Sequence, residues 1–190
     1  LKIWEGLGYY SRCRNFYKAC KIILEKFQGI VPSDFKTFLS LPGVGEYTAS
    51  AVLSIAFNKS YPVIDGNVKR VLFRLLGLKN STSYNINRIK NLLIKIIPEK
   101  FPGDFNQGLM ELGALICTPW KPQCDLCPIN LNCTAFNSGD PEKYPIRKTK
   151  IKIPHHEIVA GIIWRDTKFY IQKRNHKKML GGLWEFPGGK

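Results

Sequence analysis

Four cysteines lie in one short stretch of the chain, with the spacing C-x6-C-x2-C-x5-C. They are Cys117, Cys124, Cys127 and Cys133. Four thiolates from one loop suit zinc or a [4Fe–4S] cluster, but zinc ribbons usually pair two C-x2-C knuckles and this chain has one. Residues 1–20 do not have the pattern of a secretory signal, so metal ligation is favoured over disulfides. The spacing predicts a metal centre and favours iron–sulfur over zinc.

A carboxylate, Asp65, stands where an apolar run gives way to a helical pattern, in the stretch PVIDGNVKR. An Asp at this position can act as the N-cap of the following helix. It can also face a cleft and stabilise an oxocarbenium-like sugar, as carboxylates do in glycoside hydrolysis. One carboxylate can do both, and Lys69 and Arg70 could then meet phosphates.

A glycine turn, LPGVG at residues 41–45, separates two helical patterns. Gly43 and Gly45 allow positive φ and close approach of another backbone, so the amides at the start of the second helix could cradle a phosphate. Leu41 and Val44 would anchor the turn to the core. The alternative is an ordinary connection between two helices, without a ligand.

The stretch GLGYYSR at residues 6–12 places adjacent tyrosines beside Arg12. Aromatic side chains next to a basic residue can wedge into, or stack on, nucleic-acid bases. Packing in a protein core is the alternative for both Tyr9 and Tyr10.

The chain is strongly basic, with 29 Lys and Arg against 14 Asp and Glu and a formal net charge of +15 over 190 residues. Such an excess favours a polyanionic partner, most simply nucleic acid. A solvated basic surface is the alternative, and a membrane surface is less favoured because no basic amphipathic helix stands out. No apolar run reaches the length of a membrane span.

Helical periodicity and turn signals predict a mainly α protein. Helices are expected at 9–27, 34–40 with Ser33 as N-cap, 46–57, 66–76, 84–97 and 103–116. Polar, proline-containing residues 137–155 are typical of a linker. After them, EIVAGIIWR and KFYIQKR predict strands separated by a turn at Asp166 and Thr167. We therefore expect an α-helical part at 1–58, a second at 59–136 that carries the cysteines, and the start of a β-containing domain at 156–190.

The motifs together resemble the helix-hairpin-helix, Gly/Pro-Asp superfamily of DNA glycosylases, in particular the MutY-type adenine DNA glycosylases. GLGYYSR, LPGVGEYTA, IDGNVKRV, FNQGLMELGALICTP, the cysteine set and GGLWEFP occur in the order typical of that family, over nearly the whole chain. The resemblance implies a helix-hairpin-helix glycosylase fold with an iron–sulfur loop, followed by the start of an α+β Nudix-like domain.

The resemblance also implies an activity: excision of adenine mispaired with 8-oxoguanine or guanine in double-stranded DNA, with the adenine flipped out of the duplex. Asp65 would be the catalytic carboxylate and Asn67 would position groups beside it. The four cysteines would hold a [4Fe–4S] cluster. The residues implied to contact DNA or the adenine are Tyr9 as the wedge, Arg12, Leu41, Gly43, Val44, Gly45, Lys69, Glu111 at the adenine pocket, and Lys121.

Tyr47 separates this family from its nearest rival, the endonuclease III-like glycosylase/lyases. Those enzymes carry at this position a Lys that forms a Schiff base with the sugar, and a phenol cannot form an imine. Base hydrolysis is therefore favoured over coupled strand cleavage. A non-catalytic, DNA-binding iron–sulfur module is the remaining alternative.

Two of the family's parts are expected to lie outside this chain. One is the N-terminal helix whose Glu protonates the departing adenine, and the other is the Glu-rich helix that would complete the Nudix box begun at GGLWEFPGG. We expect a fragment of a longer, monomeric protein without a membrane partner, cytoplasmic in a bacterium and nuclear or organellar in a eukaryote.

Overall fold

The computed structural model describes residues 2–146, 154–176 and 180–189. The chain forms two compact units, Ser11–Lys148 and a second made of Leu1–Tyr10 with Thr149–Lys190. Each unit is described by itself. Part of the expected linker, residues 147–153, lies outside the described residues.

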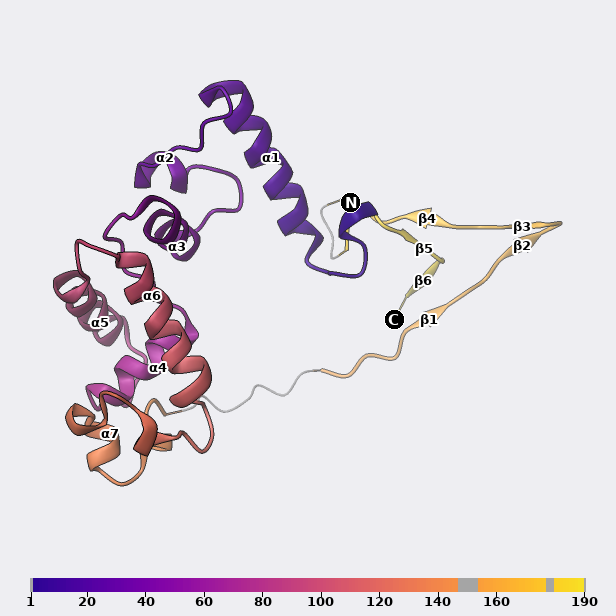
Figure 1. Ribbon diagram of the computed structural model, residues 1–190. Helices are drawn as coiled ribbons and strands as arrows, with labels where there is room; N and C mark the ends of the chain where they lie inside the picture. The colour runs from indigo at the N-terminus through magenta and orange to yellow at the C-terminus, as the bar shows by residue number, and fades with distance from the viewer. Residues whose placement is uncertain (1, 147–153, 177–179, 190) are drawn as a thin grey trace. The chain divides into compact units, whose positions relative to one another are not determined.

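The first unit is helical, as the periodicity predicts (Figure 1). Its helices are α1 (Tyr10–Phe27), α2 (Phe35–Leu39), α3 (Glu46–Phe57), α4 (Gly66–Leu75), α5 (Ser83–Ile96), α6 (Pro102–Glu111) and α7 (Thr134–Asn137). Short 3-10 turns lie at η3 (Cys124–Leu126), η4 (Asn130–Asn132) and η5 (Pro141–Lys143), and a further one, η1 (Lys2–Trp4), opens the chain. The helix expected at 103–116 changes character at its end, because η2 (Leu112–Ile116) is a π-helix.

Two helix starts differ from the sequence prediction. Asp34, and not Ser33, caps α2, because its extended backbone lets the carboxylate accept from the amides of Lys36 and Thr37. Helix α1 begins at Tyr10, since Tyr9 has a φ of 44° and lies outside the helical region. The predicted cap of α4 by Asp65 is confirmed.

Among the described residues of the helical unit, the core consists of two apolar clusters. One joins α1, α2, the glycine turn and α3 through Ala19, Phe38, Leu41, Ala49 and Leu53. The other joins α4 and α5 through residues that include Phe73, Ile89 and Leu93, with side chains of α6 packed against it. Leu41 is buried, so it anchors the glycine turn to the core as expected.

Helix α6 contacts both α3 and α4, and so links the two clusters. Gly103 permits a close approach to α3, because a Cβ built there would lie 2.8 Å from the Ile55 Cα and 2.9 Å from the Ser54 carbonyl oxygen. Farther along α6, the fully buried Asn106 donates through Nδ2 to the Ser54 hydroxyl and the Tyr61 carbonyl, and accepts from the Val63 amide. One side chain thus ties α6 to α3 and to the segment that leads into α4.

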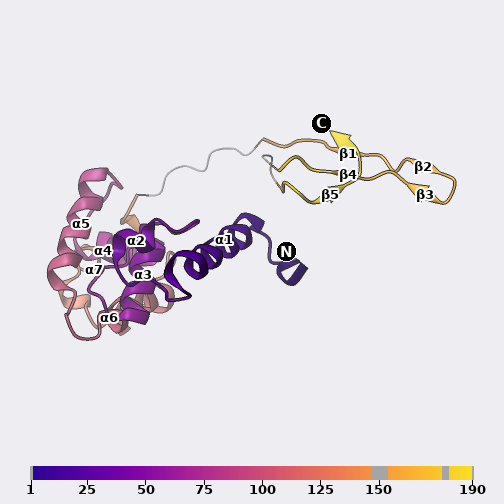
Figure 2. The same cartoon turned by 90° about the horizontal axis from the view of Figure 1, so that it is seen from above.

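The second unit contains short antiparallel strand pairs (Figure 2). These pair β1 (Val159–Ala160) with β6 (Gly188–Gly189), β2 (Trp164–Arg165) with β3 (Lys168–Phe169), and β4 (Gln172–Lys173) with β5 (Trp184–Glu185). The predicted turn is confirmed, since Asp166 has a φ of 55° in the loop between β2 and β3. Within the described ranges, no helix combines the length and apolar content that a bilayer span requires.

Two glycines of α6 provide a matched test of its packing on α3. We expect Gly103→Ala to lower the free energy of unfolding by about 1–3 kcal/mol, because the new methyl group overlaps the α3 backbone. Gly108 has nothing within 4 Å of a built Cβ, so Gly108→Ala should raise stability by up to ~1 kcal/mol through helix propensity. Urea unfolding of both variants checks this, and equal midpoints would contradict the close approach.

The Asn106 network is tested in the same way. Asn106→Ala leaves the buried Val63 amide without its acceptor and the Ser54 and Tyr61 oxygens without their donor, at about 1–3 kcal/mol for each orphaned group. The control is Asn91→Ala on the exposed face of α5, which should change stability by less than about 0.5 kcal/mol. Thermal unfolding in which both variants melt together would show that the network contributes nothing.

Candidate functional site

Asp65 is held at the N-terminus of α4 with one carboxylate oxygen committed to the helix. Its Oδ1 accepts from the Val68 amide at 2.6 Å, and the residue is half-buried. Among the described residues, no donor is bonded to Oδ2. Val63, close before it in the chain, is fully buried and tied to Asn106. The carboxylate is therefore fixed through one oxygen and leaves the other for a ligand.

Asn67 lies on the first turn of α4, where this helix crosses the π-helix η2. A Cβ built on Gly113 would lie 2.6 Å from the Asn67 Cβ, so only glycine allows the contact. Arg70 completes the junction, donating to the Asn67 Oδ1 at 2.9 Å, the Gly113 carbonyl at 2.7 Å and the Cys117 carbonyl at 2.8 Å. The start of α4 is thereby bound to the chain that enters the cysteine loop.

Arg74, one turn further along α4, is 2% exposed and holds the cysteine loop itself. It donates to the carbonyls of Thr118 at 2.7 Å, of Tyr144 at 3.1 Å and of Pro119 at 3.2 Å. Its Nη1 also lies 3.3 Å from the Cys117 carbonyl and 3.3 Å from the Cys117 Sγ. None of these acceptors is a carboxylate. A buried guanidinium normally needs an anionic partner, which an anionic group held by the neighbouring cysteines would supply.

All four cysteines of the sequence motif line one small cavity together with Arg74. They are Cys117, Cys124, Cys127 and Cys133. Burial, followed by the neighbouring thiols Cys117 and Cys133, raises the pKa of Cys124, and burial also raises the pKa of Cys127. In residues 2–146, 154–176 and 180–189, no three His, Cys, Asp or Glu side chains converge closely enough to hold a metal ion. The donor set of four thiols beside a buried cation nevertheless fits an anionic thiolate-bound cluster.

The glycine turn presents the N-terminus of α3. Gly43 is required there, because its φ is 78° and a Cβ would lie 2.7 Å from that of Asn15. Gly45 is different: it is exposed, has an extended backbone with a φ of −103°, and has nothing within 4 Å of a built Cβ. Neither strain nor packing explains that glycine. An outside group approaching the amides of α3, which has no side-chain cap, would explain it.

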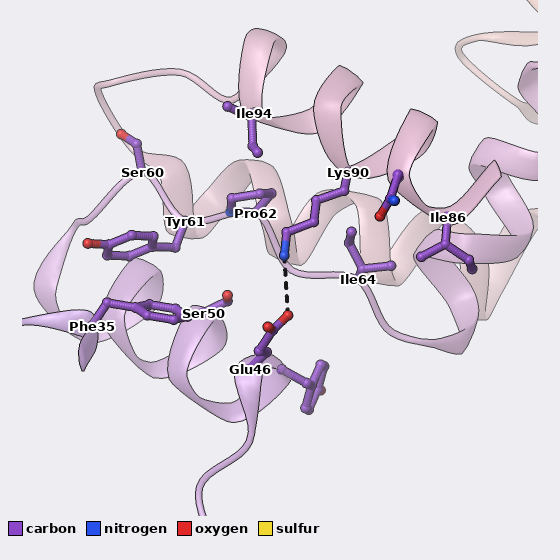
Figure 3. A pocket seen from close by; sticks show the side chains of 12 residues that line it. Phe35, Glu46, Ser50, Ser60, Tyr61, Pro62, Ile64, Ile86, Lys90 and Ile94 are labelled. Carbon is purple, nitrogen blue, oxygen red and sulfur yellow. Dashed lines mark hydrogen bonds and ion pairs between the residues drawn. The ribbon is translucent and has the colours of Figure 1, made fainter. Parts of the chain in front are cut away.

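Tyr47 lines a hollow of about 750 Å³ between α3, α5 and the segment before α4. Figure 3 shows Phe35, Tyr61 and Ile64 around this hollow, with Lys90 bridging to Glu46 at 3.3 Å. Tyr47 is 50% exposed. Ile64 shares the hollow with it, whereas Asp65 is not among the lining residues.

The remaining predicted DNA contacts are spread over the structure. Glu111 is exposed at the end of α6, and Arg12 is exposed on α1. Lys69 carries its Nζ 5.7 Å from the centre of the Phe73 ring. Lys121 has a φ of 45° in the cysteine loop, and its amide donates to the Glu142 Oε1 at 2.8 Å. Tyr9 is 77% exposed and belongs to the other unit.

Sequence reasoning missed the residues that hold the site together. Arg70 and Arg74 had no assigned structural role, and Asn106 and Gly113 were passed over inside a longer motif. A signal was present for Arg74, since it stands inside the apolar run VLFRLL, whose residues Val71, Leu72 and Phe73 are buried in α4. An arginine on the buried face of a helix indicates a buried partner.

Comparison with known proteins shows which proteins this chain resembles. The helix-hairpin-helix motif is matched over residues 26–55. The adenine DNA glycosylase of Buchnera aphidicola subsp. Schizaphis graminum is 41% identical over 189 residues, covering 98% of this chain and 54% of the relative. The adenine DNA glycosylase of Homo sapiens is 32% identical over 235 residues, covering 98% of this chain and 43% of the relative. The chain thus spans about half the length of these relatives.

Solved structures give the same fold. A thermostable thymine-DNA glycosylase matches with a TM-score of 0.61 and 33% identity, over 67% of this chain and 59% of that one. A trapped endonuclease III–DNA covalent intermediate matches with a TM-score of 0.60 and 32% identity, over 70% of this chain and 62% of that one. The chain is therefore a homologue of part of the adenine DNA glycosylases and has the fold of the helix-hairpin-helix glycosylases.

Proposed function

We propose that this chain is part of a base-excision repair glycosylase that removes adenine opposite 8-oxoguanine or guanine by hydrolysing the N-glycosidic bond. The observation that carries the proposal is the placement of Asp65, with Oδ1 in the helix cap and Oδ2 left unbonded among the described residues. We take adenine as the excised base because the relatives are adenine DNA glycosylases.

The chemistry asked of Asp65 is electrostatic. As the bond between adenine and deoxyribose breaks, the bonding electrons leave with the base and positive charge develops on the sugar. A carboxylate whose second oxygen faces this sugar stabilises that charge without reorganisation, because the cap bond has already fixed its position. Water then adds its hydroxyl group to the sugar, a proton goes to the released adenine, and an abasic site remains. Asn67, fixed by Arg70, would bound the same site.

Tyr47 supports hydrolysis over lyase chemistry. A trapped covalent intermediate is described for an endonuclease III relative, and such an adduct needs an amine to form the Schiff base. The first turn of α3 presents a half-exposed phenol in this chain. A phenol can bound a base pocket by packing and hydrogen bonding, but it cannot bind the sugar as an imine.

Contacts to the DNA backbone would come from two helix starts and from the loop that the cysteines hold. Gly45 leaves the amides of α3 open to a phosphate, and Gly43 shapes the turn that presents them. Lys69 on α4 and Lys121 in the cysteine loop add positive charge. The net charge of +15 provides the long-range attraction to double-stranded DNA.

The cysteine loop would hold a [4Fe–4S] cluster through Cys117, Cys124, Cys127 and Cys133. Such a cluster, when bound, would cross-link the loop and fix its shape. The protein's own contribution is Arg74, which donates to three carbonyls of the loop and stands beside the thiol of Cys117. The buried positive charge of Arg74 would offset the negative charge of the thiolates.

Asp65→Asn is the direct test of the proposed carboxylate. Asparagine keeps an oxygen for the Val68 amide, so the helix cap survives while the charge is lost. In the full-length parent protein, we expect the single-turnover rate of adenine release to fall by about 10²-fold or more, with unchanged thermal stability. Asp104→Asn, on the exposed first turn of α6, should leave the rate as it is. A variant Asp65→Asn with the parental rate would show that Asp65 does not stabilise the sugar.

The cluster is tested by metal analysis of protein purified without oxygen. We expect a brown protein with about four iron atoms per chain, and a colourless, zinc-loaded protein would contradict the assignment. Arg74→Met removes the loop's donors at similar volume and should speed the loss of iron in air. Arg88→Met, exposed on α5, is the matched control and should lose iron at the parental rate.

A further inference from the structure

An acidic side chain, Glu46, is the first residue of α3 and follows directly after the glycine turn. A helix start attracts anions, because its first amides lack partners and the helix dipole adds positive potential. A carboxylate at this place can oppose a second anion, either by repelling it or by taking the hydrogen bonds of the amides. Glu46 does not take them: within residues 2–146, its carboxylate accepts from Lys90 and from no backbone amide.

The partner of Glu46 comes from a distant helix. Lys90 of α5 places its Nζ 3.3 Å from the Glu46 Oε2, across 44 residues of sequence (Figure 3). Along α5, Lys90 stands midway between Ile86 and Ile94, and all three side chains line the hollow beside α3. A lysine within an apolar stripe lays its methylene groups along that stripe and extends its ammonium group to a polar partner. The face of α5 therefore directs Lys90 toward Glu46.

The ion pair changes the local charge more clearly than it changes stability. Both side chains are well exposed, 46% for Lys90 and 72% for Glu46, so the pair contributes little to the free energy of unfolding. Glu46 is the acidic residue in the first turn of α3, and Lys90 neutralises it and holds it toward α5. The amides at the start of α3 thereby keep their positive potential for an outside anion.

We propose that Lys90 is a positioning residue for DNA binding, which holds and neutralises Glu46 so that the amides at the start of α3 stay open to a backbone phosphate. Lys90 acts through Glu46 and does not itself contact the phosphate. Without Lys90, the Glu46 carboxylate turns toward the amides or repels the incoming phosphate. The inference rests on the proposed DNA-binding function of this helix start.

A double-mutant cycle in the full-length parent protein tests the role of Lys90. The duplex contains no mismatch, so affinity is measured without turnover, by fluorescence anisotropy at low salt. We expect Lys90→Met to weaken binding about 3–10-fold, because it leaves the Glu46 charge unpaired beside the phosphate. In the Glu46→Gln background, the same substitution should weaken binding by less than about 2-fold, since the residue through which Lys90 acts has lost its charge.

Two further variants separate this role from a general effect of charge. Lys90→Arg keeps the positive charge and should bind the duplex as the parent protein does. Lys95→Met is the matched control, because Lys95 is exposed on the same helix and is not among the residues that line the hollow. Its effect on affinity should be equal in the parental and the Glu46→Gln backgrounds. The coupling between Lys90 and Glu46 should also fade as salt is added, since exposed charges are screened.

The cycle has outcomes that contradict the inference. An equal loss of affinity from Lys90→Met in both backgrounds would show that Lys90 meets the DNA directly, and no loss in either background would show that it has no role in binding. Coupling of Lys95 to Glu46 as strong as that of Lys90 would identify a general charge effect and overturn the inference as well. A parent protein that binds no duplex would instead refute the proposed function, and the inference with it.

Discussion

The attachment of α4 to the cysteine loop by two arginines is the constraint on which the rest of this structure depends. Arg70 and Arg74 direct their guanidinium groups at main-chain carbonyls between Gly113 and Pro119, and Arg74 does so from a buried position. Because the donors are fixed on a helix, the acceptor carbonyls must adopt one arrangement. The π-helix η2 contributes one of these acceptors, the Gly113 carbonyl. The same helix carries Asp65 at its start. The proposed catalytic carboxylate and the proposed cluster therefore share one rigid element.

A second set of contacts fixes the chain that enters α4. Asn106 binds the Val63 amide and the Tyr61 carbonyl, while Gly103 lets α6 and α3 approach closely. The chain just before Asp65 is thus fixed by Asn106 of α6, and the Asp65 side chain is fixed by its bond to the Val68 amide. Each contact is modest, at roughly 1 kcal/mol. Their common effect is to fix one carboxylate oxygen and present the other, which is the pre-organisation that stabilising a developing sugar cation requires.

Local signals in the sequence predict most of the helical frame, because periodicity, caps and glycine turns act within a few residues. The cap by Asp65, the buried Leu41 and the turn at Asp166 follow from such signals. The choice between Ser33 and Asp34 as cap was wrong by one residue, since both side chains can accept from nearby amides. The partners of Arg74 and Asn106 lie more than 40 residues away in the chain and are mostly backbone atoms. Backbone partners leave no trace in residue type, so spacing could not reveal them.

The sharpest measurement for the account is the product analysis of one turnover on a duplex with adenine opposite 8-oxoguanine. The full-length parent protein is mixed with end-labelled duplex. Free adenine is measured, and the length of the labelled strand is measured before and after treatment with alkali. A carboxylate site with Tyr47 in place of a Schiff-base lysine predicts free adenine with an intact strand that breaks only in alkali. Strand cleavage without alkali, accompanied by a borohydride-trapped adduct, would contradict the account, and so would the absence of free adenine.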